Sequence, residues 1–129
     1  MLKRTRAAGQ RLRRDSDVAG TRNSGGSLIA RMWRGGVRTD RVDAYVEYIT
    51  ATGIADYRRT PGNLGAQMLT RDLGDGRTEV LTLSWWESLD SIRAFAGVDV
   101  GNAVFYPEDD DYLIEREATV AHYEVQSQS

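Results

Sequence analysis

LGAQMLTRDLGDGRTEVLTLSWW, residues 64–86, has the pattern of a β-hairpin. Residues 64–71 and 78–86 are each rich in apolar, β-branched and aromatic side chains, which is typical of strands. The five residues between them, DLGDG at 72–76, contain the glycines that a short hairpin loop needs. The stretch therefore predicts two antiparallel strands joined by a short loop.

A strand and a helix are expected before the hairpin. Residues 28–34, LIARMWR, form a short apolar run that predicts a strand ending at Gly35-Gly36. The apolar residues that follow have the i, i+3, i+4, i+7 spacing of one helix face: Val42, Tyr45, Val46 and Ile49. Thr39 or Asp40 is expected to cap this helix at its N-terminus, and Gly53 is expected to end it. Residues 54–63 are then a connection.

A second helix and a last strand are expected after the hairpin. Ser88 is the expected cap of a helix that ends at Gly97 and whose apolar residues are Leu89, Ile92 and Phe95. Asp99 is expected to cap a short helical turn that runs to Phe105. Residues 107–113 are expected to be an acidic loop or helical turn, and residues 118–125 a strand.

The predicted order β-α-β-β-α-β is that of a ferredoxin-like α+β fold, with an antiparallel sheet and both helices on one of its faces. Both faces of this sheet are expected to be apolar. In residues 78–86, for example, Leu81, Leu83 and Trp85 alternate with Val80 and Trp86. A sheet with two apolar faces needs a second cover, and a second copy of the chain is the simplest one. We therefore predict a homodimer that closes as a dimeric α/β barrel.

The first 26 residues differ in composition from the rest of the chain. They carry seven basic and two acidic residues and few large apolar ones, so they cannot bury enough surface to fold. We interpret residues 1–26 as a disordered basic tail or a misassigned start, and residues 27–129 as the dimeric α/β barrel domain. A basic arm that binds nucleic acid or a membrane surface is the alternative. The domain itself is acidic, which does not favour nucleic acid as a partner.

Composition excludes several classes of site. The chain has no cysteine, which excludes disulfides, thiolate catalysis and thiolate metal ligands, and His122 is the only histidine. No apolar run reaches the roughly 18 residues of a membrane span, and no secretory signal is recognisable. The expected location is the cytoplasm.

The sequence resembles the antibiotic biosynthesis monooxygenase family of dimeric α/β barrels over about residues 28–126. Five stretches carry the resemblance: residues 29–35 (IARMWRG), 60–63 (TPGN), 83–89 (LSWWESL), 92–97 (IRAFAG) and 122–125 (HYEV). The resemblance implies a homodimer with a small pocket between sheet and helices in each subunit. It also implies, for some members, oxidation of aromatic polyketide-like substrates with O2 and without a bound cofactor.

Other members of the family degrade haem, and this sequence departs from their pattern at three positions. Those members use an Asn on the first strand, a Trp about nine residues past the Trp that opens the second helix, and a His ten residues further on. Counting from Trp86 places Phe95 and Phe105 at the last two positions, and the first strand has no Asn. Because the axial His is replaced, we expect no haem and no other cofactor.

Two residues are the candidates for catalysis. His122 has the near-neutral pKa of a general base, and the alternative is a structural residue that faces the dimer barrel with Val120 and Glu124. Arg31 lies in an apolar strand, so it needs an acidic partner or a ligand anion. The functional interpretation is that Arg31 anchors a phenolate or carboxylate. The alternative is an ion pair across the sheet or the dimer interface.

The substrate pocket is expected to be aromatic, although aromatic residues at such spacings more often form a plain core. Its expected residues are Trp33, Tyr57, Asn63, Trp86, Phe95, Phe105 and Tyr106. The acidic run at residues 108–111 lacks the spaced ligands and the turning glycine of a calcium loop, so we interpret it as solvated.

Two functions remain open. The first is a cofactor-independent monooxygenase that oxidises a small aromatic or polyketide-like substrate with O2. The alternative is a non-catalytic homodimeric barrel that binds a ligand or has a stress-related role. An enzyme should have a cavity of a few hundred cubic ångströms between sheet and helices, with a polar group directed into it.

Overall fold

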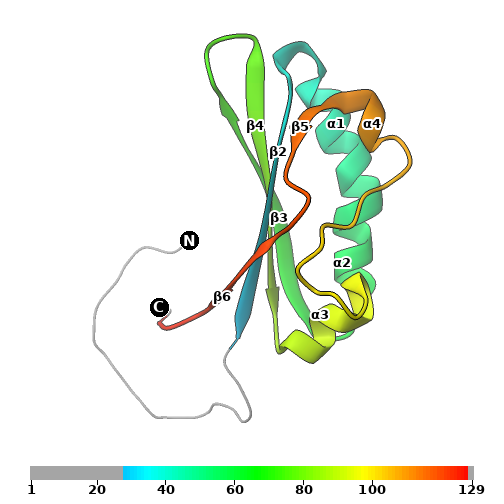
Figure 1. The fold of residues 1–129 in the computed structure, drawn as a ribbon, viewed down its shortest axis with the longest axis vertical. Coiled ribbons are helices and arrows are strands. Elements are labelled where there is room, and N and C mark those ends of the chain that lie inside the picture. Colours follow the sequence, from blue (N-terminus) through cyan, green and yellow to red (C-terminus); the bar gives the residue numbers. More distant parts are fainter. Residues whose placement is uncertain (1–27, 128–129) are drawn as a thin grey trace.

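The computed structural model describes residues 28–127, so the expected tail at residues 1–26 lies outside the described residues. Groups of helices and of strands follow one another along the chain (Figure 1). In order they are β2 (Ile29–Arg38), η2 (Thr39–Arg41), α1 (Val42–Ile49), η3 (Thr50–Ile54), α2 (Ala55–Arg59), β3 (Asn63–Asp72), β4 (Arg77–Trp86), α3 (Leu89–Ala96), α4 (Asp109–Tyr112), β5 (Leu113–Arg116) and β6 (Ala121–Glu124).

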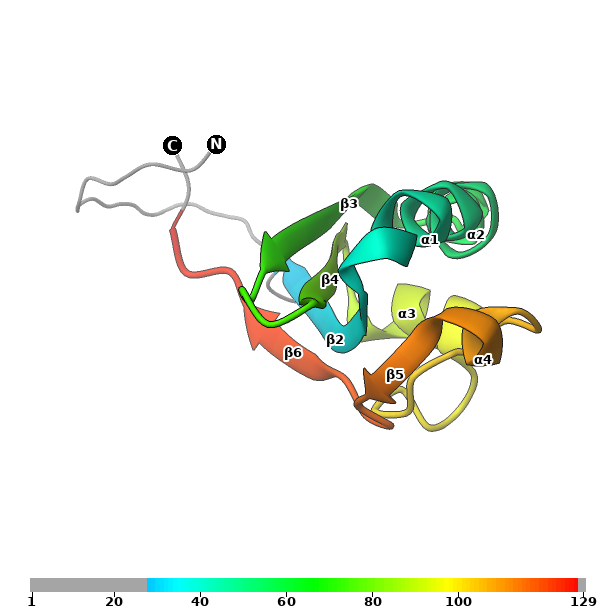
Figure 2. The same ribbon diagram turned by 90° about the horizontal axis from the view of Figure 1, so that it is seen from above.

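The sheet is antiparallel and has the strand order β3-β4-β2, with β5 and β6 both paired to the free edge of β2. All the described helices lie on one face of this sheet (Figure 2). The ferredoxin-like α+β fold predicted from the order of the elements is therefore confirmed.

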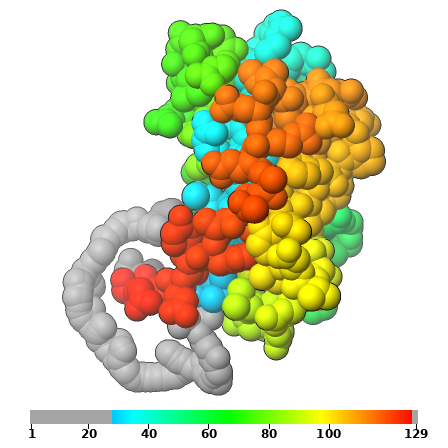
Figure 3. All heavy atoms as spheres, viewed as in Figure 1, coloured from blue at the N-terminus to red at the C-terminus, as the bar shows by residue number. Residues whose placement is uncertain are grey.

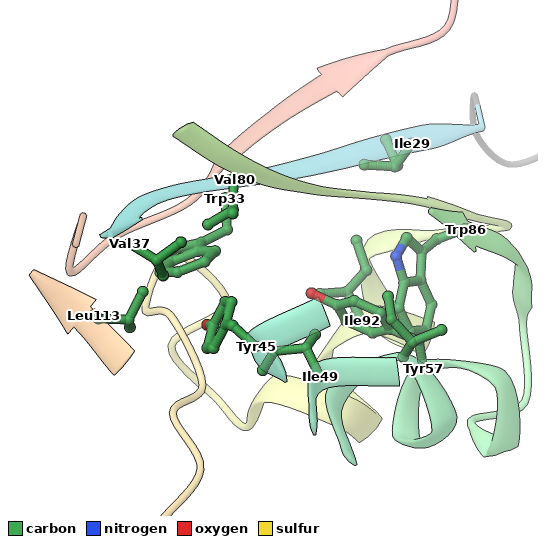
Figure 4. Packing of buried hydrophobic residues seen from close by; sticks show 11 residues of the cluster. Ile29, Trp33, Val37, Tyr45, Ile49, Tyr57, Val80, Trp86, Ile92 and Leu113 are labelled. Carbon is green, nitrogen blue, oxygen red and sulfur yellow. The ribbon is translucent and has the colours of Figure 1, made fainter. Parts of the chain in front are cut away.

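The alternation along β4 separates the two faces of the sheet. Its even-numbered residues 78–86 are buried under the helices, and Val80 and Trp86 are fully buried. Its odd-numbered residues, which include Leu81, Leu83 and Trp85, are half-buried on the open face. Figure 4 shows Val80 and Trp33 from the sheet facing Tyr45 and Ile49 from α1, at the centre of the core. Both faces are thus apolar, as expected.

Gly35-Gly36 lies inside β2 and does not end it, contrary to the prediction. β2 continues to Arg38 because β5 pairs with its last residues. The glycines allow a close approach across these strands. A Cβ on Gly35 would lie 2.5 Å from Cη2 of Trp33, and one on Gly36 would lie 2.6 Å from Cγ of Glu115.

The first helix is longer than expected and is not capped as expected. A π-helical turn, η3, joins α1 to α2, so the helical segment continues through most of the predicted connection at residues 54–63. Gly53 is buried within this turn and does not end the helix. Thr39 bonds to Thr78 through the two hydroxyl groups, and Asp40 pairs with Arg38. The continuation matters because α2 brings Tyr57 into the core.

The C-terminal part confirms most of the predicted elements, lacks one predicted helical turn and contains one strand that was not predicted. Ser88 caps α3, since its Oγ accepts from the amide of Ser91 at 3.1 Å, and Gly97 ends the helix at φ +91°. The strand predicted at residues 118–125 is found as β6, and the predicted acidic loop or helical turn at residues 107–113 contains α4. The short strand β5 between them was not predicted. The helical turn predicted to run to Phe105 does not form at Asp99. The carbonyl of Asp99 accepts from the amide of Asn102 in a single turn.

Within residues 28–127, no helix is long and apolar enough to cross a membrane.

Candidate functional site

A pocket lies between the sheet and the helical layer. The cavity itself has a volume of about 30 Å³, and the space around it, open solvent included, amounts to about 430 Å³. The cavity is therefore smaller than the few hundred cubic ångströms expected of an enzyme pocket. One wall comes from the sheet, a second from the segment α1–η3–α2, and a third from the connection between α3 and α4. This connection lies at the surface along the molecule, yellow to orange in Figure 3. The lining residues are Arg31, Trp33, Tyr45, Ile49, Gly53, Tyr57, Thr82, Phe95, Ala103, Val104, Phe105, Tyr106, Asp109 and Val120.

Arg31 is a buried cation in the wall of this pocket. It shares the helix-covered face of β2 with Ile29 and Trp33, and it is only 1 % exposed. Its guanidinium donates to the carbonyl oxygens of Val100 at 2.7 Å and Asn102 at 3.1 Å. Its Nε has no hydrogen-bond partner among the described residues.

No carboxylate of residues 28–127 forms a salt bridge with Arg31, so the ion pair considered as the alternative is not found there. Two carbonyl dipoles solvate a guanidinium less well than an anion does. A buried cation without a counterion carries a large desolvation penalty. The pocket wall therefore favours a negatively charged group, or a strong hydrogen-bond acceptor, near Arg31.

His122 lies directly opposite Arg31 in the β2–β6 ladder, on the helix-covered face. Ala121 and Tyr123 are on the open face, and Tyr123 is 54 % exposed. The alternative in which His122 faces the dimer barrel is therefore contradicted. The alternation predicted which residues share a face, but only the pairing with β2 shows which face is covered.

The contact between Arg31 and His122 defines the protonation state and the tautomer of the imidazole. Nη1 of Arg31 lies 3.0 Å from Nε2 of His122. Burial, and then the charge of Arg31, lower the pKa of His122 below its ordinary value of 6.5. Because a guanidinium only donates, Nε2 must accept, and the proton of the neutral ring is on Nδ1. His122 does not line the pocket itself, and its contact with Arg31 connects it to the pocket wall.

Asp109 lines the pocket from α4 and is only 2 % exposed. Its Oδ1 accepts from the hydroxyl of Tyr45 at 3.1 Å, and its Oδ2 accepts from the amide of Tyr106 at 2.6 Å. Burial raises the pKa of Asp109, and the two hydrogen bonds oppose this rise. The acidic run at residues 108–111 is therefore solvated except at this one position. No local pattern distinguishes Asp109 from its neighbours.

Most of the expected aromatic residues line the pocket, namely Trp33, Tyr57, Phe95, Phe105 and Tyr106. Trp86 and Asn63 are not among the lining residues. Trp86 is fully buried beneath the pocket, where its ring contacts those of Tyr57 and Phe95 at 5.7 and 6.1 Å between centroids. The side-chain amide of Asn63 donates to two backbone carbonyls, those of Gly65 and Trp85, at the start of β3.

Several lining residues were not anticipated from the sequence. They are Tyr45, Ile49, Gly53, Thr82, Ala103, Val104, Asp109 and Val120. Tyr45 and Ile49 have the spacing of the inward helix face, a signal that we assigned to core packing alone. Within the described part of the chain, no group of three histidine or acidic residues could hold a metal ion.

The comparisons with known proteins identify the fold. No protein-family model matches the chain, and no curated protein sequence matches it. A structure from Bacillus cereus, provisionally named an antibiotic biosynthesis monooxygenase, superposes with a TM-score of 0.60 at 20 % identity over 81 % of this chain and 98 % of that one.

Two further structures agree with this result. A Nitrosomonas europaea protein with the same provisional name gives a TM-score of 0.54 at 19 % identity, covering 78 % of this chain and 91 % of that one. A Mycobacterium tuberculosis protein gives a TM-score of 0.55 at 18 % identity, and the match covers 80 % of this chain and 99 % of that one. The chain therefore has the fold of the antibiotic biosynthesis monooxygenases, as its sequence resemblance implied.

Proposed function

We propose that the protein is a cofactor-independent monooxygenase that oxidises a small aromatic or polyketide-like molecule with O2. One observation carries this proposal. A buried arginine that pairs with no carboxylate of residues 28–127 lines a pocket that is otherwise mostly aromatic and apolar. Such a wall stabilises the anion of an aromatic substrate, which is the species that reacts with O2.

The reaction begins with the acidity of the substrate. The charge of Arg31 lowers the pKa of an enol or phenol bound beside it, so that the anion forms near neutral pH. The enolate carbon of an activated methylene attacks O2, and the resulting hydroperoxide loses water. A CH2 group and O2 thus become a C=O group and H2O, with one oxygen atom in the product and the other in water.

Arg31 and His122 have different proposed roles. Arg31 contacts the anion. His122 is a positioning residue, because its Nε2 accepts from the guanidinium and its ring is outside the pocket lining. A neutral imidazole at this place holds Arg31 without neutralising its charge, which a carboxylate would do.

The proposal includes a homodimer in the cytoplasm. The open face of the sheet carries a half-buried apolar group at its centre, which comprises Ala30, Met32, Leu81, Leu83 and Trp85. No described helix covers this face (Figure 2). A second copy placed sheet against sheet would bury it.

Oxygen consumption tests the proposed activity. The purified protein is incubated with a panel of anthrone- and quinol-type compounds under air and under nitrogen, and O2 uptake and product formation are measured. We expect uptake that matches product one to one. Arg31→Met should lower the rate by about 100-fold, the usual effect of removing one preorganised group that stabilises an oxyanion.

Arg58→Met is the matched control, because Arg58 is exposed on α2 and away from the pocket lining. It should leave the rate unchanged. Absence of O2 uptake with every compound, or equal rates for Arg31→Met and the native protein, would contradict the proposal. Binding without O2 uptake would support the alternative of a ligand-binding barrel.

A further inference from the structure

We propose that the pocket selects aromatic molecules that are polar at both ends, with an anionic oxygen at Arg31 and a hydroxyl group that donates to Asp109. The proposal rests on the proposed function in that it names the substrate class for the same pocket. It also makes a claim about binding that is independent of O2.

The first end of the ligand is defined by Arg31. Its side chain is almost completely buried, and its Nε has no hydrogen-bond partner among the described residues. Its other hydrogen-bond partners are two carbonyl oxygens and one imidazole, and its Cζ lies 5.7 Å from the centre of the Phe95 ring. All of these contacts are neutral. A carboxylate, phenolate or enolate oxygen would supply both the missing negative charge and the missing acceptor.

The second end is defined by Asp109. An ionised carboxylate has about four acceptor positions, and hydrogen bonds from Tyr45 and Tyr106 use two of them. No arginine of the described chain forms a salt bridge with Asp109. The nearby guanidinium of Arg116 bonds to Asp110 instead. A hydroxyl donor on a ligand would occupy a position that protein groups leave open.

The two groups reach the pocket from opposite layers of the fold. Arg31 belongs to β2 in the sheet, and Asp109 is the first residue of α4 in the helical layer. Between them the lining is largely aromatic, with Trp33 edge-on to Phe105 at 6.1 Å and Phe95 tilted against Tyr57 at 4.5 Å. An aromatic ring held between the two polar groups would contact this lining on its faces and edges.

The same geometry disfavours ligands that lack the hydroxyl group. Such a ligand would displace water from Asp109 and leave part of a buried carboxylate without a donor. Sites built to bind a hydroxyl group reject analogues that lack it much more strongly than apolar sites reject a missing methylene. We therefore expect discrimination of about tenfold or more, from a hydrogen bond to a charged group.

Isothermal titration calorimetry under nitrogen tests this on the native protein with small probes. The probes are para-hydroxybenzoate, benzoate, para-methoxybenzoate and phenol, with hydroxynaphthoate and naphthoate as a longer pair. In at least one pair, we expect the hydroxy acid to bind about tenfold more tightly than the acid that lacks the hydroxyl group. Both para-methoxybenzoate, which cannot donate, and phenol, which lacks the acid, should bind weakly.

Variants assign each end of the ligand to its residue. Asp109→Asn should remove the preference for the hydroxy acid and leave the affinity for benzoate unchanged. Asp110→Asn is the matched control, because Asp110 is the next residue along the chain and is exposed, so it should leave the preference intact. Arg31→Met should lower the affinity for both the hydroxy acid and the acid without the hydroxyl group, by a similar factor.

The side chain of asparagine has only one oxygen to accept from both the hydroxyl of Tyr45 and the amide of Tyr106, so the substitution could unfold the protein. A thermal melt must therefore first show that Asp109→Asn folds. If it does not, the comparison of probes on the native protein decides the matter. Equal affinity for hydroxylated and unhydroxylated acids in both pairs would overturn the proposal, as would loss of the preference in Asp110→Asn. Discrimination without O2 uptake would refute the proposed activity alone, and O2 uptake without discrimination would refute this inference alone.

Discussion

At the scale of single residues, the contact between Arg31 and His122 explains how a buried guanidinium is held. The two side chains come from neighbouring strands and lie directly opposite each other. The imidazole accepts a hydrogen bond only while it is neutral, and its pKa is lowered by burial and by the charge beside it. Protonation would place two cations 3.0 Å apart in a half-buried site.

This contact makes stability depend on pH in a defined direction. The folded-state pKa of His122 lies below its ordinary value of 6.5, so the unfolded chain takes up the proton first as the pH falls. The contribution of His122 is therefore fully present above pH 6.5 and is lost as the pH falls toward the folded pKa. Urea unfolding from pH 7.5 to pH 5 should show this loss, at about one proton or less per molecule.

His122→Gln is the control for this measurement, because glutamine can also accept from Arg31 but does not titrate. The variant should lack this component of the pH dependence. Identical slopes in both proteins would contradict the interpretation, as would an NMR titration that places the pKa of His122 above 6.5. The raised pKa of Asp109 changes stability in the opposite direction. Because both proteins contain Asp109, its contribution cancels when their slopes are compared.

At the scale of elements, β2 is the strand on which the site depends. It pairs with β4 along its whole length and with β5 and β6 on its other edge. The pair Gly35-Gly36 lets β5 approach, and it leaves room for the ring of Trp33 in the pocket wall. A glycine pair that looks like a strand end in isolation therefore serves close packing here.

The two glycines should respond differently to substitution by alanine. Gly35→Ala would bring Cβ to 2.5 Å from the buried ring of Trp33 and 3.1 Å from Leu113, so we expect a loss of about 1–3 kcal/mol of unfolding free energy. Gly36→Ala meets only the flexible chain of Glu115, which can move, so its effect should be smaller. Urea unfolding of both variants measures the difference. A Gly35→Ala protein as stable as the native one would show that Trp33 is free to shift.

At the scale of the whole molecule, the sheet has one covered and one open face. Apolar side chains on the open face surround Leu83, which lies between Gln67 and Met32 in the register. Ion pairs of Glu79 with Arg34 and Arg71 flank this group on the same face. An apolar centre with charged residues at its edge is typical of an interface between protein subunits.

A substitution on this face tests the homodimer. We expect the native protein to sediment as a dimer at micromolar concentration, and Leu83→Arg to sediment as a monomer, because it would place a charge at the centre of the interface. Val98→Arg is the control, since Val98 is 93 % exposed and lies beyond α3, away from this face. A native protein that is a monomer at this concentration would refute the homodimer.

Much of the fold follows from local pattern. The hairpin of β3 and β4, the capped helix α3 and the order of the elements depend on the spacing of apolar residues and on caps and glycines, which act within a few positions. The apolar character of both sheet faces also follows from alternation. These features were predicted correctly because each depends on neighbours in the sequence.

The site was decided by contacts between distant parts of the chain. Arg31 and its three partners are 69 to 91 positions apart in the sequence. Likewise Tyr45 meets Asp109 across 64 positions. Local spacing cannot show which of four consecutive acidic residues is buried or which face of a strand is covered. The sequence alone thus determined the fold and proposed Arg31 and His122, whereas the tertiary structure decided their partners and revealed Asp109, because burial and charge pairing depend on which segments meet.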